Sequence, residues 1–305
     1  RSLARVTRRV ARCVMRGGRL TMAHSRIGGA ATNASAGTDV QMQTSIGLTN
    51  QSSIETTAFW NFANLTIARI SAPTISIAGV SSIASLGGGG VNAGNLSVTA
   101  DHLMLTGGGR IEANTSDAGS GGDISVNAHD ILIRDGESAI SAQTTGIGSG
   151  GNVRLIVNNL TIGAGGSVQA STDGSGTGGS VRVDAPTVSI IGDGNPVHGQ
   201  AQISADALLS STGAAGSVQL NITGQLTIAN GAQVSSDTFG PGAGGDVMIT
   251  AQIVVVDGGG LSKTTAITTE NQFLGFGGPA GNIVLNIPDK LQLFAGDEQH
   301  PAPPL

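Results

Sequence analysis

Hydrophobic residues recur at every second position in short runs along most of the chain. In the segment "LTIGAGGSVQASTDGSGTGG", residues 160–179, one run contains Leu160 and Ile162 and the next contains Val168 and Ala170. Alternation with a period of two predicts a strand that buries one face. The Gly and Ser residues between the runs suit tight turns. The segment therefore predicts two short strands followed by a polar loop.

These alternating runs belong to a repeat. Units that start with Gly followed by Asn, Asp or Ser begin at residues 94, 122, 151, 179, 216, 245 and 281, so their spacings are 28, 29, 28, 37, 29 and 36 residues. One unit cannot bury its inward face alone, whereas stacked units bury it continuously. The sequence therefore predicts an all-β, single-stranded parallel β-helix, or β-solenoid, with three short strands in each coil of about 28 residues.

The composition agrees with a narrow β-solenoid core. The 305 residues include 49 Gly but no Tyr, one Trp and six Phe, and large rings are what fill wide interiors. No apolar run approaches 18 residues, so no membrane-spanning helix is expected. Cys13 is the single cysteine, which excludes a disulfide framework within the chain. His102 and His129 precede the second run of consecutive units, which predicts that they lie at one corner, either as solvated residues or stacked on each other.

Charge is divided unevenly along the chain. Residues 1–38 contain eight Arg and no acidic residue, whereas residues 39–305 contain seven Lys or Arg against twenty Asp or Glu, a net charge of −13. The acidic remainder, poor in aromatic residues, disfavours nucleic-acid binding. Residues 19–37 match the back half of a repeat unit. We therefore divide the chain into a basic segment 1–18, either disordered or part of a preceding coil, a β-helix repeat domain 19–294, and a Pro-rich tail 295–305.

Catalytic motifs are not evident. "GSGTGG", residues 174–179, has the spacing of a dinucleotide-binding loop, but a strand-like run, "SVRVDA", follows it. A phosphate-binding loop of that spacing needs a helix N-terminus after the glycines. We therefore predict a protein without enzymatic activity, with no catalytic residues and no organic cofactor.

Polar residues at the start of the units predict a stacked corner. Their side chains can bond to nearby backbone and stack from coil to coil. These residues are Asp39, Asn64, Asn95, Asp123, Asn152, Asp246 and Asn282.

The unit "AGSVQLNITGQLTIANGAQVSSDTFGPGAGGD", residues 215–246, resembles the repeat region of filamentous haemagglutinin-like exoproteins, the passengers of bacterial two-partner secretion. The similarity covers residues 19–294. It implies a right-handed parallel β-helix, export through an outer-membrane partner pore, and a secreted or surface-exposed adhesin. The secretion domain of that family carries Asn-Pro motifs near its start, and Asn195–Pro196 is the single Asn-Pro here. We therefore expect this chain to be a piece of the stalk, with the secretion domain missing upstream.

Two units are longer than the rest, and both insertions follow the second run. They lie around residues 191–200 and 257–266, so both are expected to project from the same side of the solenoid. Loops raised from a rigid scaffold often carry binding residues. The predicted binding residues are Asn195, His198, Lys263 and Thr264, and the expected partner is a glycan or protein on a host or neighbouring-cell surface.

A column of outward residues follows the third run. It reads Asn114, Gln143, Ser171, Asp206, Asp237 and Glu270. Its three carboxylates would lie about 4.8 Å apart in consecutive coils, which should raise at least one pKa or attract a cation. Hard oxygen ligands favour Ca²⁺, so Asp206, Asp237 and Glu270 form a candidate calcium site. The alternative function is a polysaccharide-binding or polysaccharide-degrading β-helix that uses this column.

Overall fold

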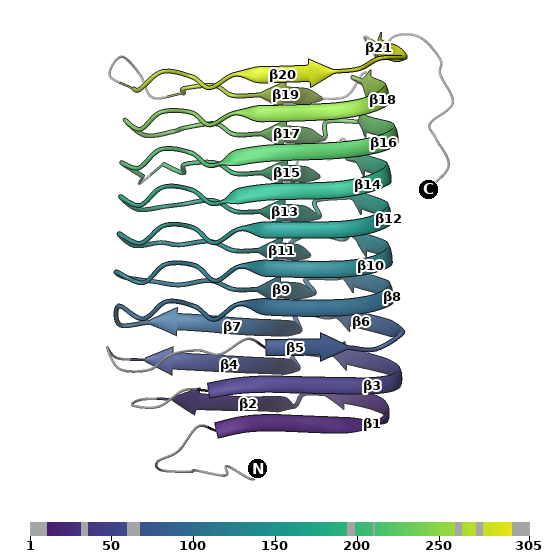
Figure 1. Cartoon of the computed structure of the whole chain (residues 1–305), viewed down its shortest axis with the longest axis vertical. Helices are drawn as coiled ribbons and strands as arrows, with labels where there is room; N and C mark the ends of the chain where they lie inside the picture. The colour runs from purple at the N-terminus through teal and green to yellow at the C-terminus, as the bar shows by residue number, and fades with distance from the viewer. Residues whose placement is uncertain are drawn as a thin grey trace.

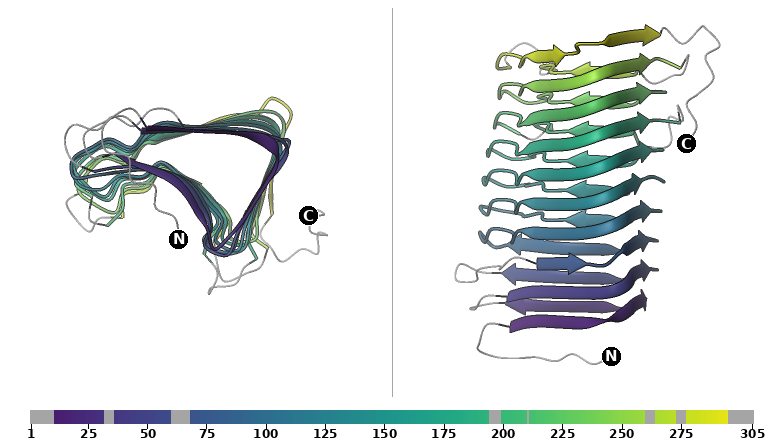
Figure 2. Two further views of the ribbon diagram at one scale, coloured as in Figure 1. Left: turned by 90° about the horizontal axis from the view of Figure 1, so that it is seen from below. Right: turned by 45° about the vertical axis from the view of Figure 1, so that its right-hand side comes forward.

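The computed structural model describes residues 11–31, 36–59, 68–193, 199–209, 211–259, 264–272 and 277–294. Within these ranges the chain is all-β, and parallel strands stack as a β-solenoid of about eight turns with roughly 29 residues in each (Figure 1). The predicted fold class is therefore confirmed. Seen along the axis, the turns superimpose as a triangle from which loops project beyond one corner (Figure 2).

One sheet contains the long strands and their interrupted equivalents. Strands follow one another in the order β1-β3-β5-β8-β10-β12-β14-β16-β18-β20, and the pairings among the described residues are parallel. Their bounds are β1 (Ala11–Ala23), β3 (Ala36–Thr49), β5 (Ala68–Ser71), β6 (Thr74–Ala78), β8 (Leu96–Thr106), β10 (Ile124–Ile133), β12 (Val153–Gly163), β14 (Ser180–Ile191), β16 (Ser217–Ala229), β18 (Val247–Asp257), β20 (Ile283–Asn286) and β21 (Lys290–Phe294).

The second sheet forms another side of the triangle and is built mainly of three-residue strands. Its order runs β19-β17-β15-β13-β11-β9-β7-β4-β2. The strands are β2 (Arg26–Ala31), β4 (Ser53–Phe59), β7 (Ser82–Gly88), β9 (Arg110–Glu112), β11 (Ala139–Ser141), β13 (Ser167–Gln169), β15 (Gln202–Ser204), β17 (Gln233–Ser235) and β19 (Ala266–Thr268). We call its solvent side the short-strand face.

The structure differs from the sequence prediction at one corner. The first and second runs of a unit were expected as two strands, but in β10 they form one continuous strand of ten residues. Its pairing with β8 and β12 continues round the bend and misses only His129. The two runs separate into β5 and β6 around Pro73, whereas β14 stays one strand across Pro186 at the same corner.

The alternating residues fill a single core along the axis. Ile124, Val126, Ile131 and Ile133 of β10 are buried, and the register places each of them beside its counterpart in β12. The third run contributes an isoleucine or valine and then an alanine that is fully buried. These alanines are Ala113, Ala142, Ala170 and Ala205. Their small size keeps this side of the triangle close to the axis, in agreement with the scarcity of aromatic residues.

A glycine at the start of each unit lets the turns approach closely. A Cβ on Gly151 would overlap the carbonyl oxygen of Gly122, and a Cβ on Gly179 would overlap that of Gly151. Gly216, Gly245 and Gly281 stand in the same relation to the glycine one turn earlier. We call these residues, with Gly122, the glycine column. They are required by the close backbone contact, which fixes the spacing between turns.

The basic N-terminal segment contributes to the solenoid. β1 begins at Ala11 and pairs with β3 from the Ala11–Ala36 pair to the Ala23–Thr49 pair. The stacked structure therefore includes residues 11–18, while residues 1–10 and 295–305 lie outside the described ranges.

Candidate functional site

The short-strand face carries a groove of about 680 Å³. Its floor is formed by outward residues of β9, β11, β13 and β15, so it runs across four successive turns. It is the candidate binding site, because it combines a concave surface with several polar side chains.

One wall of the groove comes from the first insertion. Gly199 and Gln200 line the groove, and the Gln200 side-chain amide donates a hydrogen bond of 3.4 Å to the carbonyl oxygen of Thr264 in the second insertion. The two insertions therefore lie on the same side of the solenoid, as the repeat spacing indicates. Thr264 is exposed, whereas the other predicted binding residues, Asn195, His198 and Lys263, lie outside the described residues.

Side-chain amides dominate the uncharged part of the groove. Gln143 Nε2 donates to Gln169 Oε1 at 2.9 Å, which links consecutive turns. That bond leaves the Gln169 amide nitrogen and the Gln143 amide oxygen available to a ligand. Gln202 lies one turn further along the groove. None of the described lining residues is aromatic, so recognition here depends on hydrogen bonds rather than on ring stacking.

Charged residues occur at the β9 end of the groove. Arg110 Nη2 pairs with Glu137 at 3.0 Å, and Asn114 donates a hydrogen bond of 3.0 Å to Glu112. Burial raises the pKa of Glu112, an effect opposed by nearby Arg110 and by the hydrogen bond from Asn114. Arg110 Nε is buried and has no hydrogen-bond acceptor among the described residues. This end therefore holds two acidic groups and one cation whose bonding capacity is incompletely used.

The predicted carboxylate column is present in consecutive turns, but its two aspartates bond the backbone of the next turn and Glu270 is exposed. Residues 207, 238 and 271 form parallel bridges, which places Asp206, Asp237 and Glu270 next to one another. Asp206 Oδ1 accepts a bond of 2.8 Å from the N–H of Asp237, and Asp237 Oδ1 accepts one of 2.6 Å from the N–H of Glu270. Ser235 and Thr268 donate hydroxyl bonds to the second oxygens of the two aspartates. We call this arrangement the buried ladder.

Burial is the main cause of the unusual titration of the buried ladder. It raises the pKa of Asp206 to about 6 and also raises the pKa of Asp237, with a smaller contribution from repulsion by Asp237 in the first case and by Glu270 in the second. A raised pKa was expected, although mainly from repulsion. The aspartates are 8% and 1% exposed, and no three His, Cys, Asp or Glu side chains of the described residues are arranged to hold a metal ion. The column is therefore a structural ladder in this structure.

A second ladder runs along the corner that the unit-starting residues form. The side-chain oxygen of Asn95 accepts the N–H of Asp123 at 3.0 Å, and Asp123 accepts that of Asn152 at 2.9 Å. Asn152 and Asp246 accept the N–H of Ser180 and Asn282 in the same way. The predicted stacking is confirmed for these residues, with the bonds made to the next turn. Asn64 lies outside the described residues.

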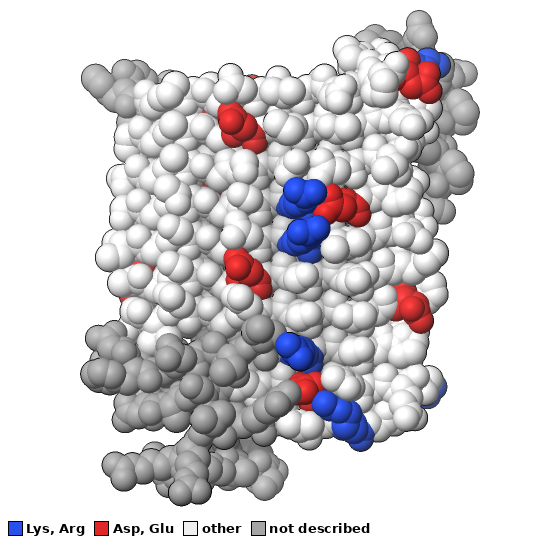
Figure 3. Space-filling model, viewed as in Figure 1, with Lys and Arg blue, Asp and Glu red and all other residues white. Residues whose placement is uncertain are grey.

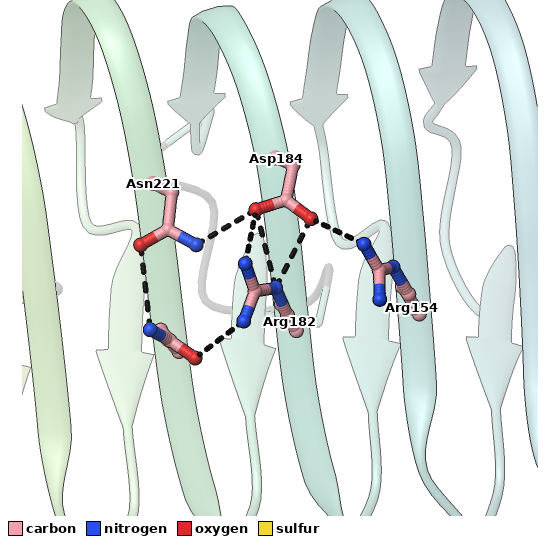
Figure 4. Close-up of polar contacts among 5 residues, drawn as sticks. Arg154, Arg182, Asp184 and Asn221 are labelled. Atoms are coloured by element: carbon pink, nitrogen blue, oxygen red, sulfur yellow. Dashed lines mark hydrogen bonds and ion pairs between the residues drawn. The ribbon is translucent and has the colours of Figure 1, made fainter.

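The face formed by the first halves of the long strands carries few charges, some isolated and some in small mixed clusters (Figure 3). In the cluster near the middle of this face, Arg182 bonds Asp184 through Nε and Nη2 at 3.0 Å, and Arg154 pairs with the same carboxylate at 3.2 Å (Figure 4). Asn221 donates to Asp184 at 2.7 Å. The hydrogen bond from Arg182 is the largest cause that lowers the pKa of Asp184. Sequence analysis did not identify this cluster.

Two histidines share one carboxylate at the bend of the long strands. His102 Nδ1 and His129 Nδ1 lie 2.9 and 3.0 Å from the two oxygens of Asp130. Their rings contact edge-on with centroids 6.3 Å apart. The predicted corner placement of these histidines is confirmed. Both are exposed, and the arrangement neither encloses a cavity nor adds residues to the groove.

The fold and the groove together define a parallel β-solenoid with a polar groove on one face. No helix in the described ranges is long and apolar enough to cross a membrane. No protein-family model, curated protein or solved structure matches the chain. The geometry of the groove is therefore the basis for assigning a function.

Proposed function

We propose that this chain is a non-enzymatic attachment segment, secreted or displayed at a bacterial cell surface, whose groove binds a glycan of a host or neighbouring cell. The observation that supports the proposal most strongly is the row of amides at Gln143, Gln169 and Gln202. An amide both donates and accepts hydrogen bonds, as does a sugar hydroxyl. The resemblance to haemagglutinin-like repeats agrees with this role and adds an outer-membrane secretion partner, recruited through an upstream domain.

Binding by such a groove is weak at a single site. Each neutral hydrogen bond contributes about 0.5–1.5 kcal/mol after the loss of bonds to water. The groove also lacks the ring stacking that aromatic residues contribute. Several copies of the chain on one surface would raise the apparent affinity without new contacts. An attachment segment presents such copies, so low single-site affinity is compatible with the proposed role.

Affinity electrophoresis through gels that contain xylan, mannan or dextran tests the proposal. Retardation of the parent chain is expected in at least one gel. The double variant Gln143→Ala with Gln169→Ala should bind about ten-fold more weakly, since it removes two amides. Asn127→Ala is the matched control, because Asn127 is an exposed outward amide on β10, away from the groove. Equal retardation of both variants, or none for the parent, contradicts the proposal.

Polysaccharide cleavage is the second candidate function. It is favoured by Glu112, whose burial raises its pKa as in a general acid, and by Glu137 in the same groove. Cleavage would release reducing ends from the same polysaccharides, and Glu112→Gln would abolish that release. Release that depends on Glu112 would replace the attachment proposal with an enzymatic one.

A further inference from the structure

The groove differs in charge between its two ends. At the β9 end, Glu112 and Glu137 contribute two negative charges and Arg110 contributes one positive charge. At the other end, β13 and β15 contribute Ser167, Gln169 and Gln202, which are uncharged. With Glu112 ionised, the lining residues therefore carry a net charge of −1, located at one end.

The cation of the groove already pairs with one glutamate through Nη2, although its buried Nε has no acceptor among the described residues. Arg110 Nη2 pairs with Glu137 at 3.0 Å, and Arg110 lies close enough to Glu112 to lower its pKa. A ligand carboxylate or sulfate that approached Arg110 would meet both glutamates. Glu112 is half-buried, so water screens its charge less than that of an exposed group. An anionic ligand would thus be repelled at this end, whereas a hydroxyl group could donate to either glutamate.

The lining residues also define a direction. Gln143 and Gln169 are joined by a hydrogen bond between consecutive turns, and Gln202 follows one turn later beside Ser167, so the three amides step diagonally across the short strands. Neighbouring parallel strands lie about 4.8 Å apart, so the floor from β9 to β15 spans roughly 14 Å along the axis. An extended saccharide chain that carries hydroxyl groups at regular intervals can contact the polar side chains of one turn after another on this floor.

Resting on the proposed function, we infer that the groove selects uncharged oligosaccharide chains over chains that carry carboxylate or sulfate groups. The oligosaccharide crosses the short strands from β9 to β15 along the diagonal that these amides form. Glu112 and Glu137 exclude anionic sugars, and Gln143, Gln169 and Gln202 bind the hydroxyl groups. The residues that exclude anionic sugars therefore differ from the residues that bind hydroxyl groups, so each set can be tested with its own variants.

Isothermal titration of the full chain tests this selection, with neutral xylan, mannan and dextran oligosaccharides as one set of probes and polygalacturonate and dextran sulfate oligosaccharides as the other. The parent chain should bind a neutral probe more tightly than either anionic probe. Raising the salt concentration should strengthen anionic binding by screening the repulsion and leave neutral binding unchanged. This comparison needs no variant.

The double variant Glu112→Gln with Glu137→Gln separates local repulsion from the overall negative charge. It should bind polygalacturonate at least about five-fold more tightly than the parent, because like-charge contacts are removed, and bind neutral probes as the parent does. The control Asp123→Asn with Asp246→Asn changes the net charge equally, at exposed residues outside the groove, and should leave both affinities unchanged. Circular dichroism verifies that each variant folds.

Three outcomes are distinguishable. Anionic probes that bind the parent as tightly as neutral probes overturn the selection but leave glycan binding intact. An equal gain in the control variant also overturns it, since the effect would then come from overall charge. Absence of binding for every probe, at any salt concentration, contradicts the proposed function itself.

Discussion

The Asp206 carboxylate bonds the backbone N–H of Asp237 one turn later, at 2.8 Å. The same position three turns earlier holds Asn114, whose amide oxygen accepts the N–H of Gln143 at 2.8 Å and the hydroxyl of Ser141 at 3.1 Å. A neutral amide therefore makes the bonds for which Asp206 uses a charged group. The negative charge of Asp206 is not needed for the ladder, and its burial makes that charge costly.

Replacing Asp206 with Asn should remove a pH-dependent cost. The folded-state pKa of Asp206 is raised from 3.8 to about 6, so folding disfavours its ionised form. This cost, about 2–3 kcal/mol at most, is fully present above pH 6 and disappears as the pH falls toward 4. Asp206→Asn should therefore be at least as stable as the parent at pH 7, with the difference vanishing near pH 4. Urea unfolding at four pH values between 4 and 7 measures it, and a variant that is less stable at pH 7 contradicts the argument.

Asp184 should show the opposite trend. Arg182 and Asn221 hold its pKa below the ordinary value, so ionisation of Asp184 favours the folded state. That contribution is present above the unfolded-state pKa and is lost as the pH falls through the lower folded-state pKa. Because the pairs are partly exposed, Asp184→Asn should cost less than about 1 kcal/mol at pH 7. The cost should shrink in 1 M salt, and a cost independent of both pH and salt would contradict an electrostatic origin.

The glycine column allows a comparison between two Gly-to-Ala substitutions. Gly151→Ala places a Cβ on the Gly122 carbonyl oxygen, so two turns must separate locally. Gly47→Ala adds the same methyl group to strand β3, where nothing lies within 4 Å of it. Gly151→Ala should lower the free energy of unfolding by about 2 kcal/mol or more, whereas Gly47→Ala should change it little. Thermal unfolding followed by circular dichroism gives both values, and similar midpoints would refute the close-contact explanation.

The buried alanines should resist enlargement. Ala142 is fully buried between Ala113 and Ala170 of the adjacent turns. Ala142→Leu forces extra methylene groups into a filled interior and should cost about 1–3 kcal/mol or more. Asn127→Leu places the same side chain on an exposed position of β10 and serves as the control. If both variants unfold at the same denaturant concentration, the interior around Ala142 contains unfilled space.

Most of the fold follows from the sequence because the core columns have a strict period of two within a unit and a regular spacing between units. Ile124, Ile131 and Ile140 are each buried where the alternation places them. The continuous bend of β10 was not predictable in this way, since pairing that continues through the corner leaves no signal in the apolar pattern. The apolar pattern also does not predict which polar side chains form hydrogen bonds with the backbone of a neighbouring turn.

The candidate site was predictable only in part. Glu112, Ser141 and Gln169 are recognisable in the sequence as outward residues of the third run, and the first insertion marks the wall that contains Gln200. The sequence does not predict how deep the groove between these residues is, because that depth depends on how the turns bend. Asp206 and Asp237 carry the carboxylates expected of a cation site. The backbone N–H groups and hydroxyls that bond their oxygens can be identified only once the strand register is known.

The equivalence of successive glycines has a consequence for the evolution of chain length. Gly151 and Gly179 occupy the same place in neighbouring turns, and the strands that follow them pair residue by residue, from Val153 with Val181 onward. A recombination event that joins the codon for residue 150 to that for residue 179 removes 28 residues, one complete turn. The columns above and below the junction stay in phase, so genes of this kind can lengthen or shorten by whole turns. A smaller deletion inside a strand would shift the inward side chains of that strand, whereas unequal loop lengths between units leave the columns in phase.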